Sequence, residues 1–502
     1  MFLEVIVALV VGVLTLWTYA FLKNYIKLKN IPAPTVWPII GTALEFKDPE
    51  ESMYIFPNLM KRLKSKTLRM HMGFRTVLVT ADYTLIERVL GSPTLTHKTY
   101  FHFIPWLGHG LFTSSGDKWR KARKLITPTF HFKILEQFLD VFNSNGVILI
   151  NKLKNEVGNT SVEVQTLMSR CTLDIICETA MGLSVNAQTE ESSEYAKCIH
   201  DITYLVNARA FTPLYNIEWI YKRTKMHKDE QAILKVLHGH TDSVIKTRRL
   251  KLQEEADKKE VGRVAENEDD FGRKKKVPFL DMLLQSTIDG RPLNDKELRD
   301  EVSTFMFAGH DTTSVAMSFT LFAIANHPEV QKKAFDELYN IFGSDKERMC
   351  TTTDLNEMKY LEMVIKESLR MYPSAPLFSR TVSENLDYNG TVIPPGIPIL
   401  FLPYSIHHDP DHFPDPEKFD PERFSPENYD GKKPFSFIPF SAGPRNCLGQ
   451  KYAMMEMKCL LSMILRQFEL KPASPVHKLE LRSAIILKSL TGIKIQFAER
   501  KY

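Results

Sequence analysis

The sequence predicts a mainly α-helical fold with small β-sheets, an α+β arrangement, preceded by one helix that can cross a membrane. Helical periodicity covers most of the chain between residues 130 and 468. Alternating or β-branched segments are confined to residues 67–81 and to the last third of the chain. The third observation is the apolar run at residues 2–22, which only Glu4 interrupts and which as a helix is long enough to span a bilayer.

We expect the apolar run to be an uncleaved membrane anchor. Lys23, Lys27 and Lys29 follow it directly, and this positive charge predicts that the rest of the chain stays on the cytoplasmic side. A cleaved signal peptide is the alternative, but its apolar region would be shorter and would end in a small-residue cleavage site. The chain then divides into a transmembrane anchor (1–22), a basic and proline-rich connector (23–45) and a single large domain (46–502).

The body of the chain is predicted to begin with strands and to continue as helices. Residues 67–74 and 75–81 predict a strand pair, and residues 83–90 predict a helix after it. Further helices are predicted at residues 130–154, 164–181, 229–252, 295–325, 329–342, 354–371 and 448–468.

Two other segments complete the prediction. Residues 485–488 and 492–497 predict the strands of a hairpin whose tip is 489–491. Residues 248–276 are dense in both signs of charge and poor in apolar residues, which predicts a solvated connection inside one domain.

Composition excludes some classes of function. A hydrophobic fraction of 43%, a charged fraction of 25% and a net charge of +5 describe a globular protein with no nucleic-acid partner. The six cysteines form no C-x-x-C pair, which indicates a reducing compartment rather than a disulfide framework. We therefore expect most of them to be small core residues.

One cysteine stands apart, in the segment FSAGPRNCLG at residues 440–449. A helix start after Cys447 would stabilise a thiolate there, Gly443 and Gly449 would let the backbone approach a flat ligand, and Arg445 could pair with a carboxylate. These features suit a thiolate-ligated haem, with a buried structural cysteine as the alternative. The pattern F-x-x-G-x-R-x-C-x-G also includes Phe440.

With this pattern the chain resembles the cytochrome P450 superfamily, the haem-thiolate monooxygenases, from the anchor to the C-terminus. The resemblance implies the P450 fold, and it implies that Cys447 is the axial ligand of a haem b iron. Thiolate ligation pushes electron density onto the iron and favours O–O cleavage.

A second motif is AGHDTT, residues 308–313, within the longest predicted helix. Ala308 and Gly309 would permit close approach of a ligand, and an adjacent acid and hydroxyl could relay protons to dioxygen. By resemblance Asp311 and Thr312 are that pair. The alternative is a threonine that merely bonds back to a helix carbonyl.

Three more residues match the family's Glu-Arg-Arg network: Glu367, Arg370 and Arg423. We expect them to stabilise the haem side of the fold, although a Glu and an Arg three residues apart on a helix are often only a surface ion pair.

A further set of residues is implied at the haem propionates. Trp119 and Arg123 match a W-x-x-x-R helix motif, and Arg380 is expected in a similar role. His131 is a candidate for contact with the haem side. For each arginine the alternative is ordinary solvent exposure.

No flavin or nicotinamide motif follows a strand, so the electrons must come from another protein. The resemblance implies NADPH–cytochrome P450 reductase, with cytochrome b5 as a further candidate, and an endoplasmic reticulum membrane location. An ordinary solvated charged face is the alternative to a basic docking surface. The cations expected at that surface are Arg120, Lys121, Arg123, Lys124, Lys432, Lys433 and Lys451.

Segments 301–314 and 106–132 look most like family 4 of the superfamily, in its microsomal and insect-type members, which hydroxylate fatty acids and related lipids at or near the chain end. Many family 4 members carry Glu where this chain has Ala308, and that Glu can form an ester to a haem methyl. We therefore expect non-covalent haem and a less constrained pocket. The pocket candidates are Phe101, Phe103, Ile104, Phe305, Met306, Ala375, Leu377 and Leu490.

Three functions are kept open on these residues. The first is a monooxygenase that acts on a fatty acid, a related lipid or a foreign compound. The second is a haem-thiolate isomerase or dehydratase of lipid peroxides that needs no reductase. The third is a non-catalytic carrier of haem or lipid, in which a proton relay would have no purpose.

Overall fold

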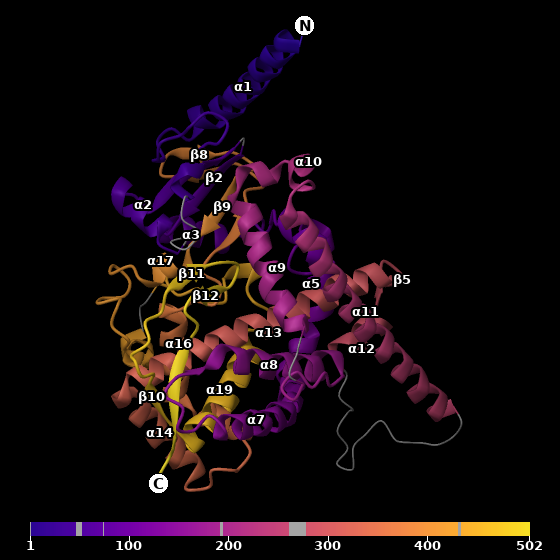
Figure 1. Ribbon diagram of the computed structural model, residues 1–502, viewed down its shortest axis with the longest axis vertical. Helices are drawn as coiled ribbons and strands as arrows, with labels where there is room; N and C mark the ends of the chain where they lie inside the picture. The colour runs from indigo at the N-terminus through magenta and orange to yellow at the C-terminus, as the bar shows by residue number, and fades with distance from the viewer. Residues whose placement is uncertain (1, 47–52, 74, 191–193, 261–277, 430–432) are drawn as a thin grey trace.

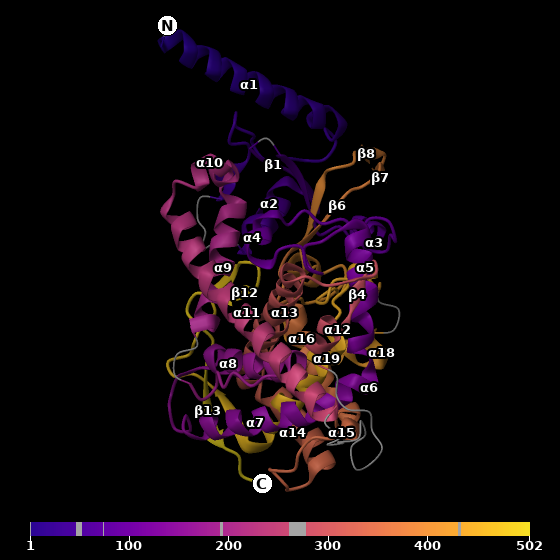
Figure 2. The ribbon, with the colours of Figure 1, turned by 90° about the vertical axis from the view of Figure 1, so that its right-hand side faces the viewer.

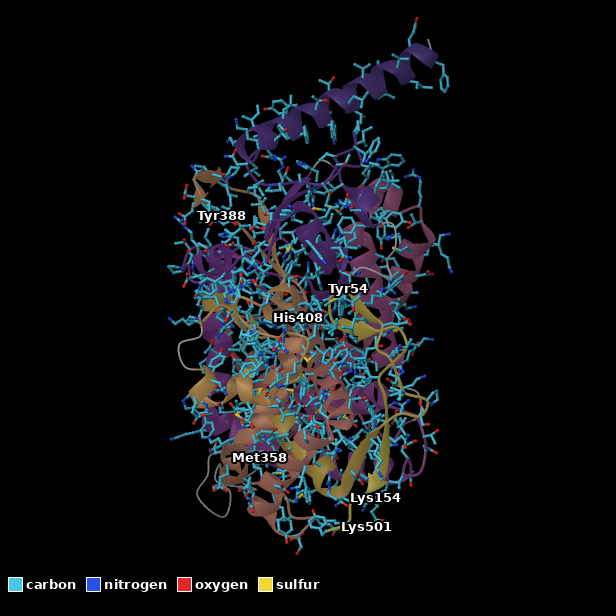
Figure 3. The ribbon with its side chains drawn as sticks, turned by 90° about the vertical axis from the view of Figure 1, so that its left-hand side faces the viewer. Tyr54, Lys154, Met358, Tyr388, His408 and Lys501 are labelled. Carbon is cyan, nitrogen blue, oxygen red and sulfur yellow. The ribbon has the colours of Figure 1, made fainter. Side chains whose placement is uncertain are left out.

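The computed structural model describes residues 2–46, 53–73, 75–190, 194–260, 278–429 and 433–502. It confirms a mainly helical protein with small sheets (Figure 1). One sheet lies near the end of the molecule from which the first helix emerges, and another lies near the end that carries the C-terminus. In a view from another side, Tyr388 lies toward the first of these ends, and Lys154 and Lys501 lie toward the second (Figure 3).

Helix α1 (Phe2–Lys27) projects from the body, and its side chains extend into open space (Figures 2 and 3). Within Glu4–Lys27, an 18-residue window has a mean hydropathy of 2.4, so the helix is long and apolar enough to cross a membrane. The helix continues past residue 22, where the predicted anchor ends. Its last turns contact the body: the Phe21 ring lies 5.0 Å from that of His71, and Arg69 donates to the Tyr25 carbonyl at 3.2 Å.

The sheet beside α1 has the strand order β1 (Thr67–Met72), β2 (Arg75–Thr80), β9 (Pro398–Phe401) and β6 (Phe378–Thr381). The predicted strand pair and the helix after it, α3 (Tyr83–Leu90), are confirmed. Strand β2 runs parallel to β9, with Leu78 opposite Ile399. Pairing across more than 300 residues brings the first and last thirds of the body together.

The predicted C-terminal hairpin is wrong, because its two strands belong to different sheets. Strand β12 (Leu487–Ser489) pairs with β11 (Leu481–Ser483), whereas β13 (Lys494–Glu499) pairs with β10 (Phe468–Pro472) and β3 (Val162–Glu163). The turn at Gly492, with φ of 75°, leads the chain away from β12. Short apolar strands have several possible partners, and packing of the rest of the chain selects one. Two small hairpins complete the sheets: β4 (Thr287–Ile288) with β5 (Arg291–Pro292), and β7 (Leu386–Tyr388) with β8 (Thr391–Ile393).

The helices form one large hydrophobic core. The longer ones are α5 (Gly116–Ile126), α7 (Leu139–Lys154), α8 (Val164–Ile176), α9 (Glu194–Phe211), α11 (Lys225–Glu260), α13 (Asp295–Asn326), α14 (Pro328–Phe342), α16 (Lys359–Met371) and α19 (Gln450–Gln467). Shorter ones are α2 (Ile55–Leu63), α4 (Ile104–Leu107), α6 (Phe132–Leu135), α10 (Glu218–Tyr221), α12 (Phe279–Gln285), α15 (Thr352–Glu357), α17 (Pro403–His407) and α18 (Pro426–Tyr429).

Several predicted helix bounds need correction. The helix expected from residue 130 begins at Leu139, after a series of short turns, and the one expected over 354–371 is interrupted at Met358. Helix α11 runs to Glu260, into the segment predicted as a connection. Its Lys, Glu, Gln and Leu residues favour helix even where they are solvated, so low apolar content did not exclude a helix there. Residues 261–277 of that segment lie outside the described residues.

Helix α13 crosses the middle of the body (Figure 1) and packs against α8, α11, α16 and α19. A capping box opens it: the Asn294 side chain accepts from the Glu297 amide, and the Glu297 carboxylate accepts from the Asn294 amide, both at 3.0 Å. Most of its length is buried on all sides, as expected of a helix at the centre of a large core.

Candidate functional site

One short stretch of α13 is accessible in the middle of its buried length. From Asp300 to Leu321 every residue is buried except Ala308, Gly309 and Thr312. Positions i, i+1 and i+4 lie on one side of an α-helix, so these residues face the same space. A space bordered by the centre of a core helix is suited to an enclosed ligand.

The two small residues of this stretch have different roles. Ala308 is exposed to the space and carries no polar group. A Cβ on Gly309 would lie 2.6 Å from Cδ1 of Ile176 on α8. Gly309 was predicted to admit a ligand; it remains partly accessible, and its missing side chain also permits the close packing of α13 on α8.

Thr312 is held by two hydrogen bonds. Its hydroxyl donates to the Ala308 carbonyl at 2.7 Å, and the Ser374 hydroxyl donates to the Thr312 carbonyl at 2.9 Å. The back-bonding considered as the alternative for this residue is therefore present. The residue is still partly accessible, so its hydroxyl oxygen can accept a further hydrogen bond from a group in the space.

The cysteine loop is a tight structure before α19. Ser441 and Gly443 have positive φ angles of 57° and 68°, and a Cβ on Gly443 would lie 1.7 Å from the Leu90 carbonyl oxygen. The Cys447 amide donates to the Phe440 carbonyl at 2.8 Å, which closes the loop. Glycine is therefore required at residue 443 by its conformation and by the neighbouring backbone.

The Cys447 thiol is accessible although it is closely surrounded by protein. Its side chain is exposed, and yet burial raises the pKa of the thiol. The Gly449 amide, Arg123 and Lys98 act against this rise and favour the thiolate, although burial has the larger effect on the pKa.

Three predicted cations lie around this loop. Arg123 donates to the Asn446 side-chain oxygen at 2.8 Å, and Arg380 donates to the Ser441 hydroxyl at 3.0 Å. Arg445 lies over the Trp119 ring at 4.5 Å and donates to backbone carbonyls before α5. The structure thus brings these predicted residues together.

A fourth cation, Lys98, was missed by the sequence analysis. Its Nζ lies 4.5 Å from the centre of the Phe112 ring, and the charges of Arg123, Arg380 and Arg445 act on it. No motif surrounds Lys98 in the sequence. Only the fold brings it next to a loop almost 350 residues later, so no local signal could have identified it.

The four cations repel one another. Burial and then the charges of Arg380 and Arg123 lower the pKa of Arg445 to about 9. Burial, followed by the charge of Arg445, lowers the pKa of Lys98 as well. In the described part of the chain, none of the four forms an ion pair with a carboxylate. Arg380 and Arg445 are buried, and Lys98 and Arg123 are half-buried. Such cations without a counter-charge are costly, and the two propionates of haem b would complete the cluster, so these residues fit that cofactor.

Asp311 lies in a different direction from Thr312. It is 6% exposed, and its Oδ2 atom has no hydrogen-bond partner among the described residues. Asp311 interacts electrostatically with Lys488 of β12. Burial lowers the pKa of that lysine, and the negative charge of Asp311 raises it. The two predicted relay residues are neighbours in sequence, but the structure gives them separate surroundings.

The Glu-Arg-Arg network is assembled as predicted. Arg370 donates to both carboxylate oxygens of Glu367 at 2.8 Å, and Arg423 lies 3.4 Å from that carboxylate. The Glu367 and Arg370 side chains are 0% exposed, which excludes the surface ion pair that was the alternative. Arg370 also donates to the His407 carbonyl, so the pair joins α16 to the chain after β9.

The pocket candidates divide into those near the site and those elsewhere. The Phe103 ring meets the Phe112 ring edge to face, and the Phe112 carbonyl accepts a hydrogen bond from Arg445. Phe305 is wedged between other aromatic rings and is only 8% exposed. Met306 is 0% exposed, so its predicted place in the pocket is wrong. Two residues along a helix turn its direction by about 200°, which points Met306 away from the face of Ala308.

The remaining candidates have different surroundings. Phe101 lies under the Arg75 guanidinium at 4.3 Å, and Ile104 and Leu490 are exposed. Ala375 follows Ser374, which bonds to Thr312. Leu377 borders a cavity of only about 10 Å³ on the side of α2, away from Cys447.

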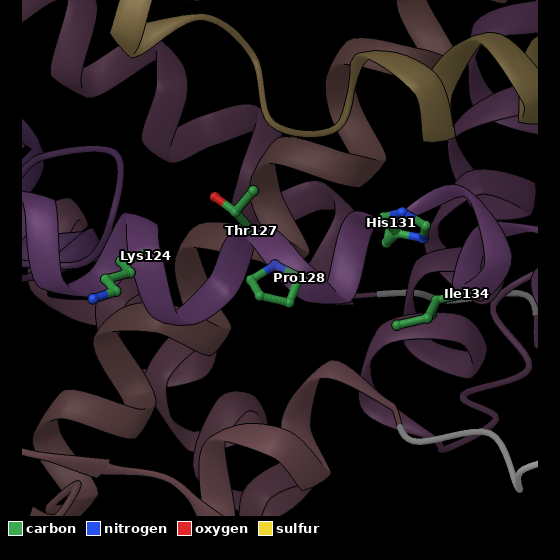
Figure 4. A pocket seen from close by; sticks show the side chains of 5 residues that line it. All are labelled: Lys124, Thr127, Pro128, His131 and Ile134. Carbon is green, nitrogen blue, oxygen red and sulfur yellow. The ribbon is translucent and has the colours of Figure 1, made fainter.

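A larger cup of about 670 Å³ lies on the outside of the molecule at the end of α5 (Figure 4). It contains none of the Cys447 loop, and we therefore do not regard it as the reaction site. His131, which was a candidate for haem contact, borders this outer cup. The full lining is Lys124, Thr127, Pro128, His131 and Ile134.

Comparisons with known proteins agree with this geometry. The family described as Cytochrome P450 matches residues 31–497. "Cytochrome P450 4c3" of Drosophila melanogaster is 37% identical over 480 residues, which cover 94% of this chain and 90% of the relative. "Cytochrome P450 4c21" of Blattella germanica is 43% identical over 449 residues, with 88% of each chain covered. "Cytochrome P450 4V2" of Homo sapiens is 39% identical over 477 residues, with 93% and 90% covered.

Proposed function

Because the chain belongs to the cytochrome P450 family and is therefore a haem-thiolate monooxygenase, we propose that it hydroxylates a fatty acid or related lipid in the endoplasmic reticulum membrane. The proposal includes NADPH as the source of electrons, through NADPH–cytochrome P450 reductase. One observation carries it: the accessible Cys447 thiol lies beside a group of four cations that have no carboxylate partner in the described part of the chain.

The residues that would hold the haem follow from this arrangement. Cys447 would ligate the iron, and Lys98, Arg123, Arg380 and Arg445 would pair with the propionates. When bound, the haem supplies an iron that activates dioxygen, and thiolate ligation favours O–O cleavage. Ala308 has no carboxylate to form an ester, so we propose that the haem is non-covalent.

The chain's own part in catalysis is to hold protons and to exclude water. Thr312 would accept a hydrogen bond at Oγ1, in an orientation set by the bond that its hydroxyl donates to the Ala308 carbonyl. Asp311 would be the acid of the relay, one residue away and on the side of Lys488. The buried length of α13 on both sides of Thr312 would limit water entry.

The redox partner would bind a basic surface on the side of Cys447. Arg120 and Lys121 already pair with Asp117 and Asp289 at 2.6 and 2.7 Å. The attraction for an acidic partner would therefore come mainly from exposed Lys124, Lys433 and Lys451. Lys432, also predicted here, lies outside the described residues.

The test uses the full-length protein in membranes with the reductase and NADPH. We expect a hydroxylated product from fatty acids of at least one chain length, with the hydroxyl located by mass spectrometry, and none from Cys447→Ser. If the haem is fully loaded but no fatty acid gives an NADPH-dependent product, the lipid proposal fails, and foreign compounds become the better candidates. Conversion of a lipid hydroperoxide without reductase would support the isomerase or dehydratase alternative.

A further inference from the structure

Two acidic side chains on α13 hold the segment that precedes α5. The Asp300 carboxylate accepts from the His109 amide at 2.8 Å, and the Glu301 carboxylate accepts from the Leu111 amide at 2.9 Å. Both acids are buried, with exposures of 7% and 6%. Neither forms an ion pair in the described part of the chain, so the backbone of the segment supplies their hydrogen bonds.

The segment fits against α13 because it contains two glycines. A Cβ on Gly108 would lie 1.9 Å from the Asp300 carboxylate, and one on Gly110 would lie 2.5 Å from the Asp300 carbonyl oxygen. Gly108 also has a φ of 51°, which other residues rarely adopt. The Thr113 hydroxyl donates to the Gly108 carbonyl at 2.8 Å and holds the turn closed.

The other end of the same segment supports two of the four cations. Arg445 donates to the Ser114 carbonyl at 2.8 Å and to the Phe112 carbonyl at 3.2 Å. The Lys98 amide donates to the Ser115 hydroxyl at 2.9 Å. Residues 108–115 therefore connect the acids of α13 with the cations beside Cys447.

We propose that Asp300 and Glu301 are positioning residues that fix segment 108–115 and, through it, place Arg445 and Lys98 for haem binding. The two acids touch no reacting group themselves. The inference rests on the proposed haem site, which supplies the ligand for these cations.

The charge on Glu301 makes the attachment of segment 108–115 to α13 dependent on pH. Burial and the charge of Asp300 raise the pKa of Glu301 from 4.5 to about 7, although the Leu111 amide and Lys118 act in the opposite direction. An opened segment would return the carboxyl to water and to its usual pKa, so the closed form binds the proton more tightly. Opening should become easier as pH rises from about 4.5 to about 7, and the pH dependence should level off above that.

The first test measures hydrogen exchange of segment 108–115 in the full-length protein, with and without haem. Asp300→Ala with Glu301→Ala should speed exchange of the segment at least ten-fold, whereas Asp300→Asn with Glu301→Gln keeps acceptors and should stay near wild type. Asp242→Ala is the matched control, because Asp242 holds α13 through Arg299 outside the site. Between pH 6 and pH 8, exchange of wild type relative to the Asn/Gln variant should rise about ten-fold.

The second test measures the rate at which haem transfers to apomyoglobin. We expect at least a ten-fold faster loss from the folded alanine pair and no change in Asp242→Ala. The inference is overturned if the alanine pair keeps both slow exchange and slow haem loss, or if the Asn/Gln variant behaves like it. Failure of wild type to give a thiolate-type carbon monoxide spectrum would instead refute the proposed haem site. Hydrogen exchange of the haem-free protein would still decide whether Asp300 and Glu301 fix segment 108–115.

Discussion

Replacing Glu367 by Gln should cost more stability than almost any other change of similar size. The carboxylate accepts two hydrogen bonds from Arg370 at 2.8 Å and one from the Asp420 amide at 2.9 Å. The Glu367 carboxylate also lies 3.4 Å from Nε of Arg423. A glutamine keeps one acceptor, places an amide donor against a guanidinium donor and removes the only negative charge from the group.

The size of the stability loss in Glu367→Gln follows from the burial of the ion pair. For charges about 4 Å apart, attraction at an effective dielectric constant of about 20 is about 4 kcal/mol. Breaking a fully buried ion pair by removing one partner typically costs about 3–5 kcal/mol. We therefore expect Glu367→Gln to lower the free energy of unfolding by about 3–5 kcal/mol, and Glu367→Leu with Arg370→Met to cost less than the sum of the two single changes.

The assay is urea unfolding of the full-length protein in detergent, followed by tryptophan fluorescence under conditions where refolding recovers the signal. Asp336→Asn is the control, because it breaks an exposed ion pair with Lys332 and should cost less than about 0.5 kcal/mol. A loss below about 1 kcal/mol for Glu367→Gln, or strict additivity in the double variant, would refute the argument from burial.

Three further predictions concern the site itself. Thr312→Ala should lower hydroxylation per NADPH by about 10²-fold and raise peroxide release, whereas Thr320→Ala, which removes an equivalent bond to the Ala316 carbonyl at 2.7 Å, should leave this ratio unchanged. Lys98→Met should stabilise the haem-free protein against urea by about 1 kcal/mol, because three cations lose a repelling neighbour, and it should speed haem loss. A less stable haem-free variant would contradict the mutual repulsion of the four cations. Gly443→Ala should lower the free energy of unfolding by about 2 kcal/mol or more, whereas Gly239→Ala, in open space on α11, should not lower it. Equal unfolding midpoints for the two variants would show that the loop can relax.

Local patterns allowed part of the site to be predicted. The Cys447 loop was identifiable because its chemistry depends on residues within ten positions, and Glu367 and Arg370 share one helix turn. Lys98 could not be found, since its role depends on contact with a loop from the far end of the chain. The same applies to Asp300 and Glu301, whose partners are backbone amides that carry no signal in the sequence.

The errors have the same origin. The apolar segment 485–488 was correctly expected to contribute a strand, but its pairing depends on competition among several strands. Met306 was expected in the pocket because it lies in a segment that resembles family 4, although helix geometry turns it to the opposite side. Periodicity predicts which residues share a face, and only packing shows which face meets the ligand.

The contacts at the end of α1 affect how this enzyme would meet its substrate. The Asn24 side chain donates to Thr76 at 3.3 Å, and Leu28 just beyond the helix is fully buried, so the helix joins the body as a bracket rather than as a loose tether. With α1 in a bilayer, the body would keep a fixed inclination to the lipid surface. Molecules dissolved in the membrane would then reach the same side of the enzyme in every encounter, and their partitioning into lipid, more than their concentration in water, would set how often the site is filled.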